Sequence, residues 1–173
     1  MKRFTALTVL LAAIAAYGFA EYPPEGWTAD IIEAIEQAER EDKMLLLNFT
    51  GSDWCGWCHK LEGEVFGTQE FETWAEDNLV RVFLDFPRGI DLSDETRQQN
   101  AVLQQMLGVA GYPTVWLLGS DLTPLLKTGY QDGGPASYIA HLERDQINLE
   151  PAEAENFRRG FRQGIEEYIG PIG

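Results

Sequence analysis

The chain contains two cysteines, and both lie in residues 54–60, which read WCGWCHK. Two cysteines separated by two residues form the dithiol of many redox enzymes, whereas the same pair followed by histidine is the attachment sequence of c-type haem. A bridge between residues this close closes a very small loop and constrains the unfolded chain little, so a mainly structural disulfide explains the spacing poorly. The motif therefore predicts chemistry at Cys55 and Cys58.

The first twenty residues predict export. Lys2 and Arg3 precede an apolar run, and residues 18–20 place small side chains at the positions that a signal peptidase reads. The run is shorter than a membrane-spanning helix requires, so we expect a signal peptide cleaved after Ala20, with an uncleaved anchor as the alternative. We expect the exported chain in the periplasm, where thiols are held oxidised or must be actively reduced.

The composition is strongly acidic, with 28 Asp and Glu against 13 Lys and Arg and a formal charge of −15. Removal of residues 1–20 leaves 11 Lys and Arg and a charge of −17. This charge argues against nucleic acid or anionic lipid as partners. Two cysteines and two scattered histidines lack the paired spacing of a zinc finger, so no metal is expected.

Apolar periodicity predicts a mixed sheet with helices on both faces. The expected strands are residues 44–49, 79–86, 113–118 and 125–130, and the expected helices are residues 28–41, 56–66, 68–77, 94–107, 135–146 and 151–169. The predicted organisation is a signal peptide (1–20), an extended leader (21–27), one α/β domain (28–146) and a C-terminal helical extension (147–173).

Four segments together resemble the thioredoxin superfamily, specifically the exported thioredoxin-like proteins of bacteria. They are LLLNFTGSDWCGWCHKLEGEVF, VRVFLDF, GVAGYPTVWLL and LLKTGY, within about residues 28–146. The pairing of Trp-Cys-x-x-Cys with a later Gly-x-Pro-Thr makes the resemblance specific. It implies a thioredoxin fold and an oxidoreductase that exchanges disulfides with protein substrates and with an unidentified redox partner. The implied redox group is the Cys55–Cys58 disulfide, with no other cofactor.

The two sulfurs have different expected roles. If a helix begins at the motif, Cys55 lies at its N-terminus, where unpaired N–H groups and the helix dipole favour a thiolate nucleophile. Cys58 lies one turn further along, so we expect it to be more buried and to act as the resolving thiol.

The expected substrate-binding residues surround this pair. The resemblance places Tyr112 and Pro113 at the family's cis-proline site beside the dithiol, although a proline that opens an edge strand is the alternative. Trp54 and Trp57 flank the sulfurs and predict an apolar platform for peptide substrates. A role of Trp57 as a steric lid over the dithiol fits the sequence equally well.

Proton transfer is less clearly assigned. Asn48 occupies the place, or the neighbouring place, of a buried aspartate in thioredoxins, and an amide is no base. The remaining candidates are water, His59 and Glu62. Asp85 also matches a recurring family position and is expected to be structural. Residues 87–94 resemble an inserted loop that is either solvated or in contact with a partner.

Two other functions remain alternatives to an enzyme. One is a thioredoxin-like binding module whose cysteines are incidental. The other is a c-type haem carrier, for which Met44, Met106 and His141 are the candidate further ligands. If the chain is an enzyme, the residues between its cysteines bear on the direction of the reaction. Residues 56–57 contain neither the proline of common reductants nor the histidine of strong oxidants, and we expect a reductase or isomerase.

Overall fold

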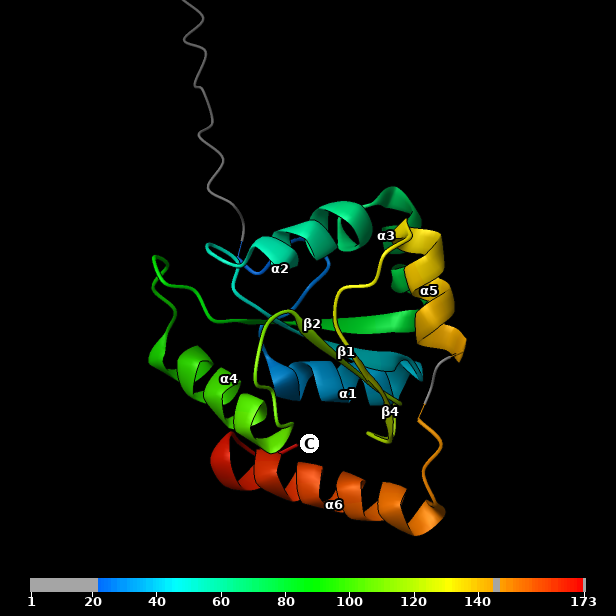
Figure 1. The fold of residues 1–173 in the computed structure, drawn as a ribbon. Coiled ribbons are helices and arrows are strands. Elements are labelled where there is room, and N and C mark those ends of the chain that lie inside the picture. Colours follow the sequence, from blue (N-terminus) through cyan, green and yellow to red (C-terminus); the bar gives the residue numbers. More distant parts are fainter. Residues whose placement is uncertain (1–21, 145–146, 173) are drawn as a thin grey trace, which may run out of the picture.

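The computed structural model of the chain describes residues 22–144 and 147–172. Its sheet has four strands in the order β2-β1-β3-β4. The strands are β1 (Met44–Thr50), β2 (Leu79–Asp85), β3 (Thr114–Leu118) and β4 (Pro124–Thr128). β1 is parallel to β2 and antiparallel to β3, which is antiparallel to β4. The expected mixed sheet is confirmed (Figure 1).

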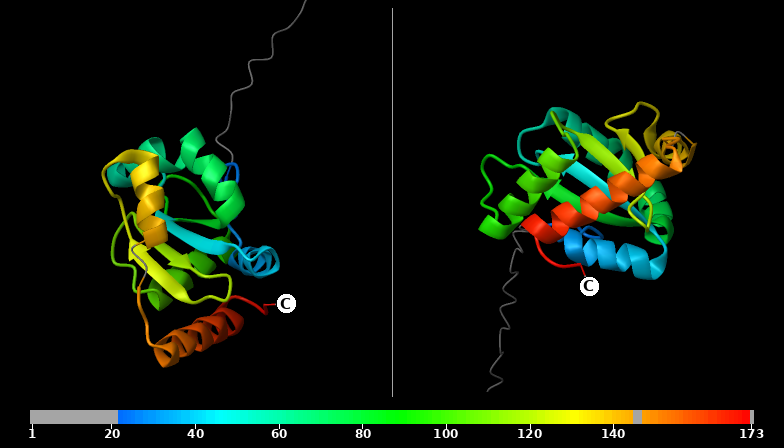
Figure 2. Two further views of the ribbon diagram at one scale, coloured as in Figure 1. Left: turned by 90° about the vertical axis from the view of Figure 1, so that its right-hand side faces the viewer. Right: turned by 90° about the horizontal axis from the view of Figure 1, so that it is seen from below.

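Helices cover both faces of the sheet (Figures 1 and 2). One face packs against α1 (Ile31–Glu41), α4 (Asp94–Met106) and α6 (Pro151–Tyr168). The other packs against α2 (Gly56–Leu61), the π-helical turn η1 (Glu62–Phe66), α3 (Gln69–Asn78) and α5 (Gly134–Arg144). The predicted helix 56–66 is thus two segments, because hydrophobic spacing does not distinguish an α-helix from one that ends in a wider turn.

β1 carries the site and is buried on both faces. Leu45, Leu47 and Phe49 pack with α1, α4 and α6, whereas Leu46 packs with the helices of the opposite face. A parallel central strand covered on both sides requires such a continuous apolar run. Asn48 lies on the same face as Leu46, below α2, because side chains alternate along a strand.

α1 begins at Ile31, three residues later than predicted. The Asp30 carboxylate caps it by accepting bonds from the N–H groups of Ile32 and Glu33 at 2.9 and 3.1 Å. Thr28 instead extends the sheet, because its N–H donates to the Arg81 carbonyl at 2.9 Å.

The leader is not extended throughout residues 22–27. The Trp27 N–H donates to the Pro24 carbonyl at 3.0 Å, and Gly26 adopts a φ of 76° that closes this turn. The Trp27 side chain is buried against Phe66 and Phe83. The leader therefore adds to the core.

β4 ends at Thr128, two residues before the predicted end at 130. The Gly129 carbonyl accepts a hydrogen bond from the Tyr138 hydroxyl at 3.1 Å, outside the sheet ladder. The early end frees Tyr130 to lie beside Trp57, with ring centroids 5.3 Å apart.

The C-terminal helix expected at residues 151–169 is confirmed as α6, and it covers the core. Phe161 and Ile165 are buried, and the Phe157 ring lies 6.0 Å from that of Trp116. Figure 2 (right) shows α6 crossing the face between α4 and α1. Each buried side chain of this size contributes about 1.5–3 kcal/mol.

The predicted signal peptide and the last two residues of the predicted helix 135–146 lie outside the described residues. Within residues 22–144 and 147–172, no helix is both long enough and apolar enough to cross a membrane.

Candidate active site

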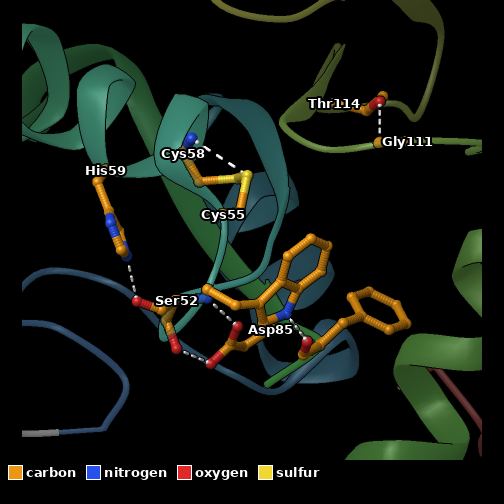
Figure 3. Close-up of a disulfide and its surroundings, with 9 residues drawn as sticks. Ser52, Cys55, Cys58, His59, Asp85, Gly111 and Thr114 are labelled. Atoms are coloured by element: carbon orange, nitrogen blue, oxygen red, sulfur yellow. Dashed lines mark hydrogen bonds between the residues drawn. A yellow bond between two sulfur atoms is a disulfide. The ribbon is translucent and has the colours of Figure 1, made fainter. Parts of the chain in front are cut away.

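The two cysteines form a disulfide where the turn after β1 enters α2. The S–S distance is 2.09 Å and the Cα–Cα distance is 5.2 Å. Cys55 has an extended backbone and is the N-cap of α2, and its Sγ accepts a hydrogen bond from the Cys58 N–H at 3.2 Å (Figure 3). The predicted helix-terminal position of Cys55 is confirmed.

In the disulfide form the two cysteines are almost equally buried, so the expected greater burial of Cys58 stays a prediction for the reduced form. Cys55 is 6% exposed and Cys58 is 5% exposed. The S–S bond holds both sulfurs at the same point on the surface, so both share the same cover. What distinguishes them is the helix terminus, because only Cys55 lies at the N-cap.

The end of β2 fixes the turn that leads to Cys55. The buried Asp85 carboxylate accepts hydrogen bonds from the Ser52 N–H at 2.8 Å and from the Ser52 hydroxyl at 2.5 Å (Figure 3). The Trp54 indole N–H donates to the Phe86 carbonyl at 2.8 Å. Burial raises the pKa of Asp85, and the bonds from Ser52 oppose this rise. Asp85 thus has the structural role expected of it.

A second set of contacts joins the same turn to the loop after β2. The Asp53 carboxylate accepts bonds from the backbone N–H groups of Arg88, at 3.0 Å, and of Gly89, at 2.5 Å. These bonds lower the pKa of Asp53. The Arg88 guanidinium carbon lies 4.0 Å from the centroid of the Trp54 ring. The inserted loop therefore borders the redox site.

Tyr112 and Pro113 flank the site from the strand β3 side. Their peptide bond is cis, in agreement with the resemblance. The Tyr112 ring contacts that of Trp54 at a centroid distance of 5.8 Å, and its hydroxyl accepts a bond from Gln104 at 2.6 Å. The Thr114 hydroxyl donates to the Gly111 carbonyl at 2.8 Å and closes the turn before β3 (Figure 3).

Trp57 is an exposed aromatic side chain between the two cysteines in sequence, with 59% of its surface accessible. The Lys60 amine lies over both neighbouring rings, 5.3 Å from the Trp57 centroid and 4.6 Å from that of Tyr130. Exposure of a large apolar ring beside a redox group is what an apolar substrate platform requires.

His59 points back to the turn and not to the sulfurs (Figure 3). Its Nε2 lies 2.6 Å from the Ser52 carbonyl oxygen. A carbonyl accepts only, so Nε2 carries the proton in this contact. Any exchange of protons with the dithiol would have to use Nδ1.

Asn48 and Glu62 lie on the side of the sheet that α2 covers. Asn48 belongs to β1, and Glu62 is the first residue of η1, directly after α2. Asn48 is buried, and its Oδ1 has no hydrogen-bond partner among the described residues. Burial raises the pKa of Glu62, with a further rise from Glu72 and an opposing effect of Arg81. The charges of Glu72 and Arg81, which form an ion pair with each other, thus act on the Glu62 carboxyl in opposite directions.

The three candidate haem ligands are not brought to the cysteines. Met44 opens β1, at the opposite end of the strand from the motif. Met106 ends α4 and lies against Gly164 of α6. His141 Nε2 lies 2.8 Å from the Thr128 hydroxyl. Both sulfurs that haem attachment requires are joined to each other.

Sequence reasoning missed several residues of the site, namely Ser52, Asp53, Arg88, Lys60 and Tyr130. Each is a common residue type in a turn, loop or exposed helix position, and its partner is distant in sequence or belongs to the backbone. The Cys-x-x-Cys motif indicates a role for its neighbours in sequence, but nothing in it indicates that the loop after β2 packs beside them.

Comparisons with known proteins agree with this geometry. Residues 26–120, more than half of the chain, match the family described as thioredoxin-like. The disulfide bond reductase DsbH of Chlamydia pneumoniae is 33% identical over 111 residues, which cover 64% of this chain and 67% of that protein. The thioredoxin-related protein DsbJ of the same organism is 28% identical over 103 residues, 60% of this chain and 30% of that protein.

A solved structure of a DsbH oxidoreductase superposes with a TM-score of 0.64 and 28% identity. The match covers 80% of this chain and 92% of the other. This similarity is consistent with the thioredoxin fold. The chain is therefore a member of the thioredoxin-like family and a thiol–disulfide oxidoreductase.

Proposed function

We propose that the protein is an exported reductase of protein disulfides. The Cys55 thiolate attacks one sulfur of a substrate disulfide, and the other substrate sulfur leaves and takes up a proton. Cys58 then attacks Cys55, which releases the substrate as a dithiol and leaves the Cys55–Cys58 disulfide. An unidentified dithiol partner reduces this disulfide for the next cycle. The cycle uses no cofactor besides these two sulfurs.

The observation that carries the proposal is the N-cap position of Cys55. Its Sγ already accepts the Cys58 N–H, and α2 and η1 continue this segment to Phe66. Hydrogen bonds to a charged acceptor are stronger than those to a neutral one, so the same contact favours the thiolate over the thiol in the reduced protein. Cys58 has no such terminal position and keeps its proton more readily.

The resolving step requires an acceptor for the Cys58 proton. Asn48 offers only an amide, and His59 has its Nε2 committed to Ser52. We propose that water, His59 Nδ1 or Glu62 serves here, and Glu62 has a raised pKa that brings it closer to neutral pH.

Substrate binding is assigned to the exposed rings and to the cis-proline segment. Trp57 presents the largest exposed apolar surface of the site, while Trp54 and Tyr112 form a continuous aromatic contact that ends at Pro113. An unfolded or extended segment with apolar side chains would pack on this surface as it delivers its disulfide.

The reductive direction is supported by the chlamydial relative that is named a disulfide bond reductase. Export is supported by residues 1–20, whose pattern is that of a signal peptide, and the periplasm is the compartment in which such a reductase would meet protein disulfides.

A Cys58→Ser variant tests the proposal. The first attack by Cys55 proceeds, but the mixed disulfide persists because no thiol resolves it. Exported proteins should accumulate as covalent adducts that dithiothreitol releases, as seen on non-reducing gels and by mass spectrometry. The matched controls are Cys55→Ser and the double variant, in which adducts should be absent. If Cys58→Ser forms no adducts while partners co-purify equally with every variant, the chain acts as a binding module.

A further inference from the structure

Arg88 lies beside the redox site in a fixed position. Its backbone N–H donates to both oxygens of the Asp53 carboxylate, at 3.0 Å each. Its guanidinium lies 4.0 Å from the centroid of the Trp54 ring, and Trp54 precedes Cys55. Backbone and side chain are thus both tied to the turn that carries the nucleophile, which keeps the cation beside Trp54, the residue before Cys55.

Among the described residues, no carboxylate oxygen is paired with the Arg88 guanidinium within 4.0 Å, although the Arg88 charge helps to lower the pKa of Asp53. Lys60, the cation near Trp57, differs because its amine has Glu64 at 3.8 Å and Asp132 at 4.0 Å. The Asp53 carboxylate, which contacts the Arg88 backbone, directs its oxygens to the N–H groups of Arg88 and Gly89. Arg88 is exposed, so a carboxylate from outside can reach its guanidinium.

Stacking on an indole face leaves the donors of a guanidinium available at its edge. The N–H groups lie in the guanidinium plane, so a group that covers one face does not block them, and two of them match the two oxygens of a carboxylate. The whole chain is acidic, with a formal charge of −15, and repels anions at longer range. Attraction at Arg88 is therefore local, and it acts on the part of a substrate that reaches Cys55.

We propose that Arg88 forms a carboxylate subsite that selects disulfide substrates with Asp or Glu beside the reacting cysteine. The inference rests on the proposed reduction of peptide disulfides by Cys55. A substrate sulfur that reaches Cys55, which is 6% exposed, brings its neighbouring residues close to Trp54 and to the guanidinium stacked on it. An acidic neighbour meets the guanidinium there, whereas a basic neighbour is repelled.

The test uses short synthetic peptides with one cysteine as a mixed disulfide with 2-thiopyridine. The residues on both sides of the cysteine are glutamate, glutamine or lysine. Cys55 attacks the peptide sulfur and releases pyridine-2-thione, which is followed by its absorbance. Cys58 then releases the peptide thiol, so the protein dithiol is oxidised as the pyridyl disulfide is reduced. Second-order rate constants are measured with pre-reduced protein.

The readout is the ratio of the rate constants for the glutamate and lysine peptides. This ratio cancels any change in the reactivity of Cys55 itself. In Arg88→Gln this ratio should fall about threefold to tenfold, which corresponds to the usual strength of one exposed ion pair at each flanking position. In Arg88→Glu it should fall further. Added salt should lower the ratio in the wild type and leave that of Arg88→Gln nearly constant.

Arg159→Glu is the matched control, because Arg159 is an exposed arginine of α6, on the opposite face of the sheet from α2 (Figure 1). The substitution changes the net charge as Arg88→Glu does and should leave the ratio unchanged. An equal ratio in the wild type and Arg88→Gln, with both folded by urea titration, overturns the subsite. If no peptide oxidises the dithiol, the proposed reductase function fails and the subsite with it.

Discussion

Asp85 is the residue on which the position of the redox turn depends. Its buried carboxylate accepts both bonds that Ser52 can donate. Burial raises its pKa despite these bonds, so the ionised form is less stable in the fold than in the unfolded chain. A group with a raised pKa contributes its full stability below the unfolded pKa of about 3.9 and loses it as pH rises through the folded value.

As pH rises from about 3.5 to 7, the free energy of unfolding of Asp85→Asn should therefore increase relative to that of the wild type, because the amide remains neutral. Urea unfolding at several pH values measures the difference in free energy. For Asp53→Asn, the change in relative stability with pH should have the opposite sign. The bonds from Arg88 and Gly89 lower the pKa of Asp53, so its contribution to stability is lost as pH falls below about 3.9. A difference for Asp85→Asn that is constant with pH would contradict the assigned direction.

At the scale of elements, the site consists of two loops fastened together. Three residues of the turn after β1 join it to the end of β2 and to the loop that follows. Ser52 bonds to Asp85, and Trp54 and Asp53 bond to the backbone of Phe86 and Arg88. Parallel strands end at the same edge of a sheet, so β1 and β2 deliver both loops to one place. The loop after β2 thereby becomes a wall of the active site.

Asp53→Ala should loosen this loop, because it removes the acceptor of the Arg88 and Gly89 N–H groups. We expect trypsin to cleave the exposed bond after Arg88 about threefold to tenfold faster, as loss of one or two such bonds would allow. Cleavage between Arg88 and Gly89 is followed by mass spectrometry. Asp91→Ala is the control, since Asp91 is an exposed carboxylate of the same loop without a bond to the described residues. Equal cleavage rates of Asp53→Ala and Asp91→Ala would show that the Asp53 hydrogen bonds do not hold the loop in place.

At the scale of the whole molecule, the proposed reductase function requires a dithiol whose disulfide form is favoured. Strongly oxidising members of such systems stabilise their reduced form through the thiolate. Here the Cys55 sulfur accepts one hydrogen bond from the described residues, and His59 is bonded to the turn and not to the sulfur. This single hydrogen bond favours the Cys55 thiolate as a nucleophile, and we expect it to stabilise the reduced form less than a set of several donors would.

The reduction potential should lie closer to about −270 mV, that of thioredoxin, than to about −120 mV, that of DsbA. Equilibration with mixtures of reduced and oxidised glutathione, followed by acid trapping and mass spectrometry, measures it. A Ser52→Ala variant, which keeps the backbone bonds but loses the hydroxyl bond to Asp85, serves as a comparison with both cysteines intact. A wild-type potential above about −150 mV would exclude a reductase.

Much of this architecture was predictable because it depends on local and periodic signals. The apolar run of β1, the helical spacing of α6 and the Cys-x-x-Cys motif each have a direct physical meaning within one window of sequence. The start of α1 was misplaced because Thr28 pairs with the distant Arg81, and the end of β4 because Tyr138 takes the Gly129 carbonyl. Long-range hydrogen bonds decided both boundaries.

The sequence by itself determined the order of the elements, the redox pair and the absence of an acid at Asn48, because those follow from residue identity and spacing. Only the tertiary structure decided which residues surround the pair. It placed Arg88 over Trp54, Tyr130 beside Trp57 and His59 against Ser52. Residues remote in sequence meet there because parallel strands and a hairpin end near one point, and no local pattern encodes which side chains then come into contact.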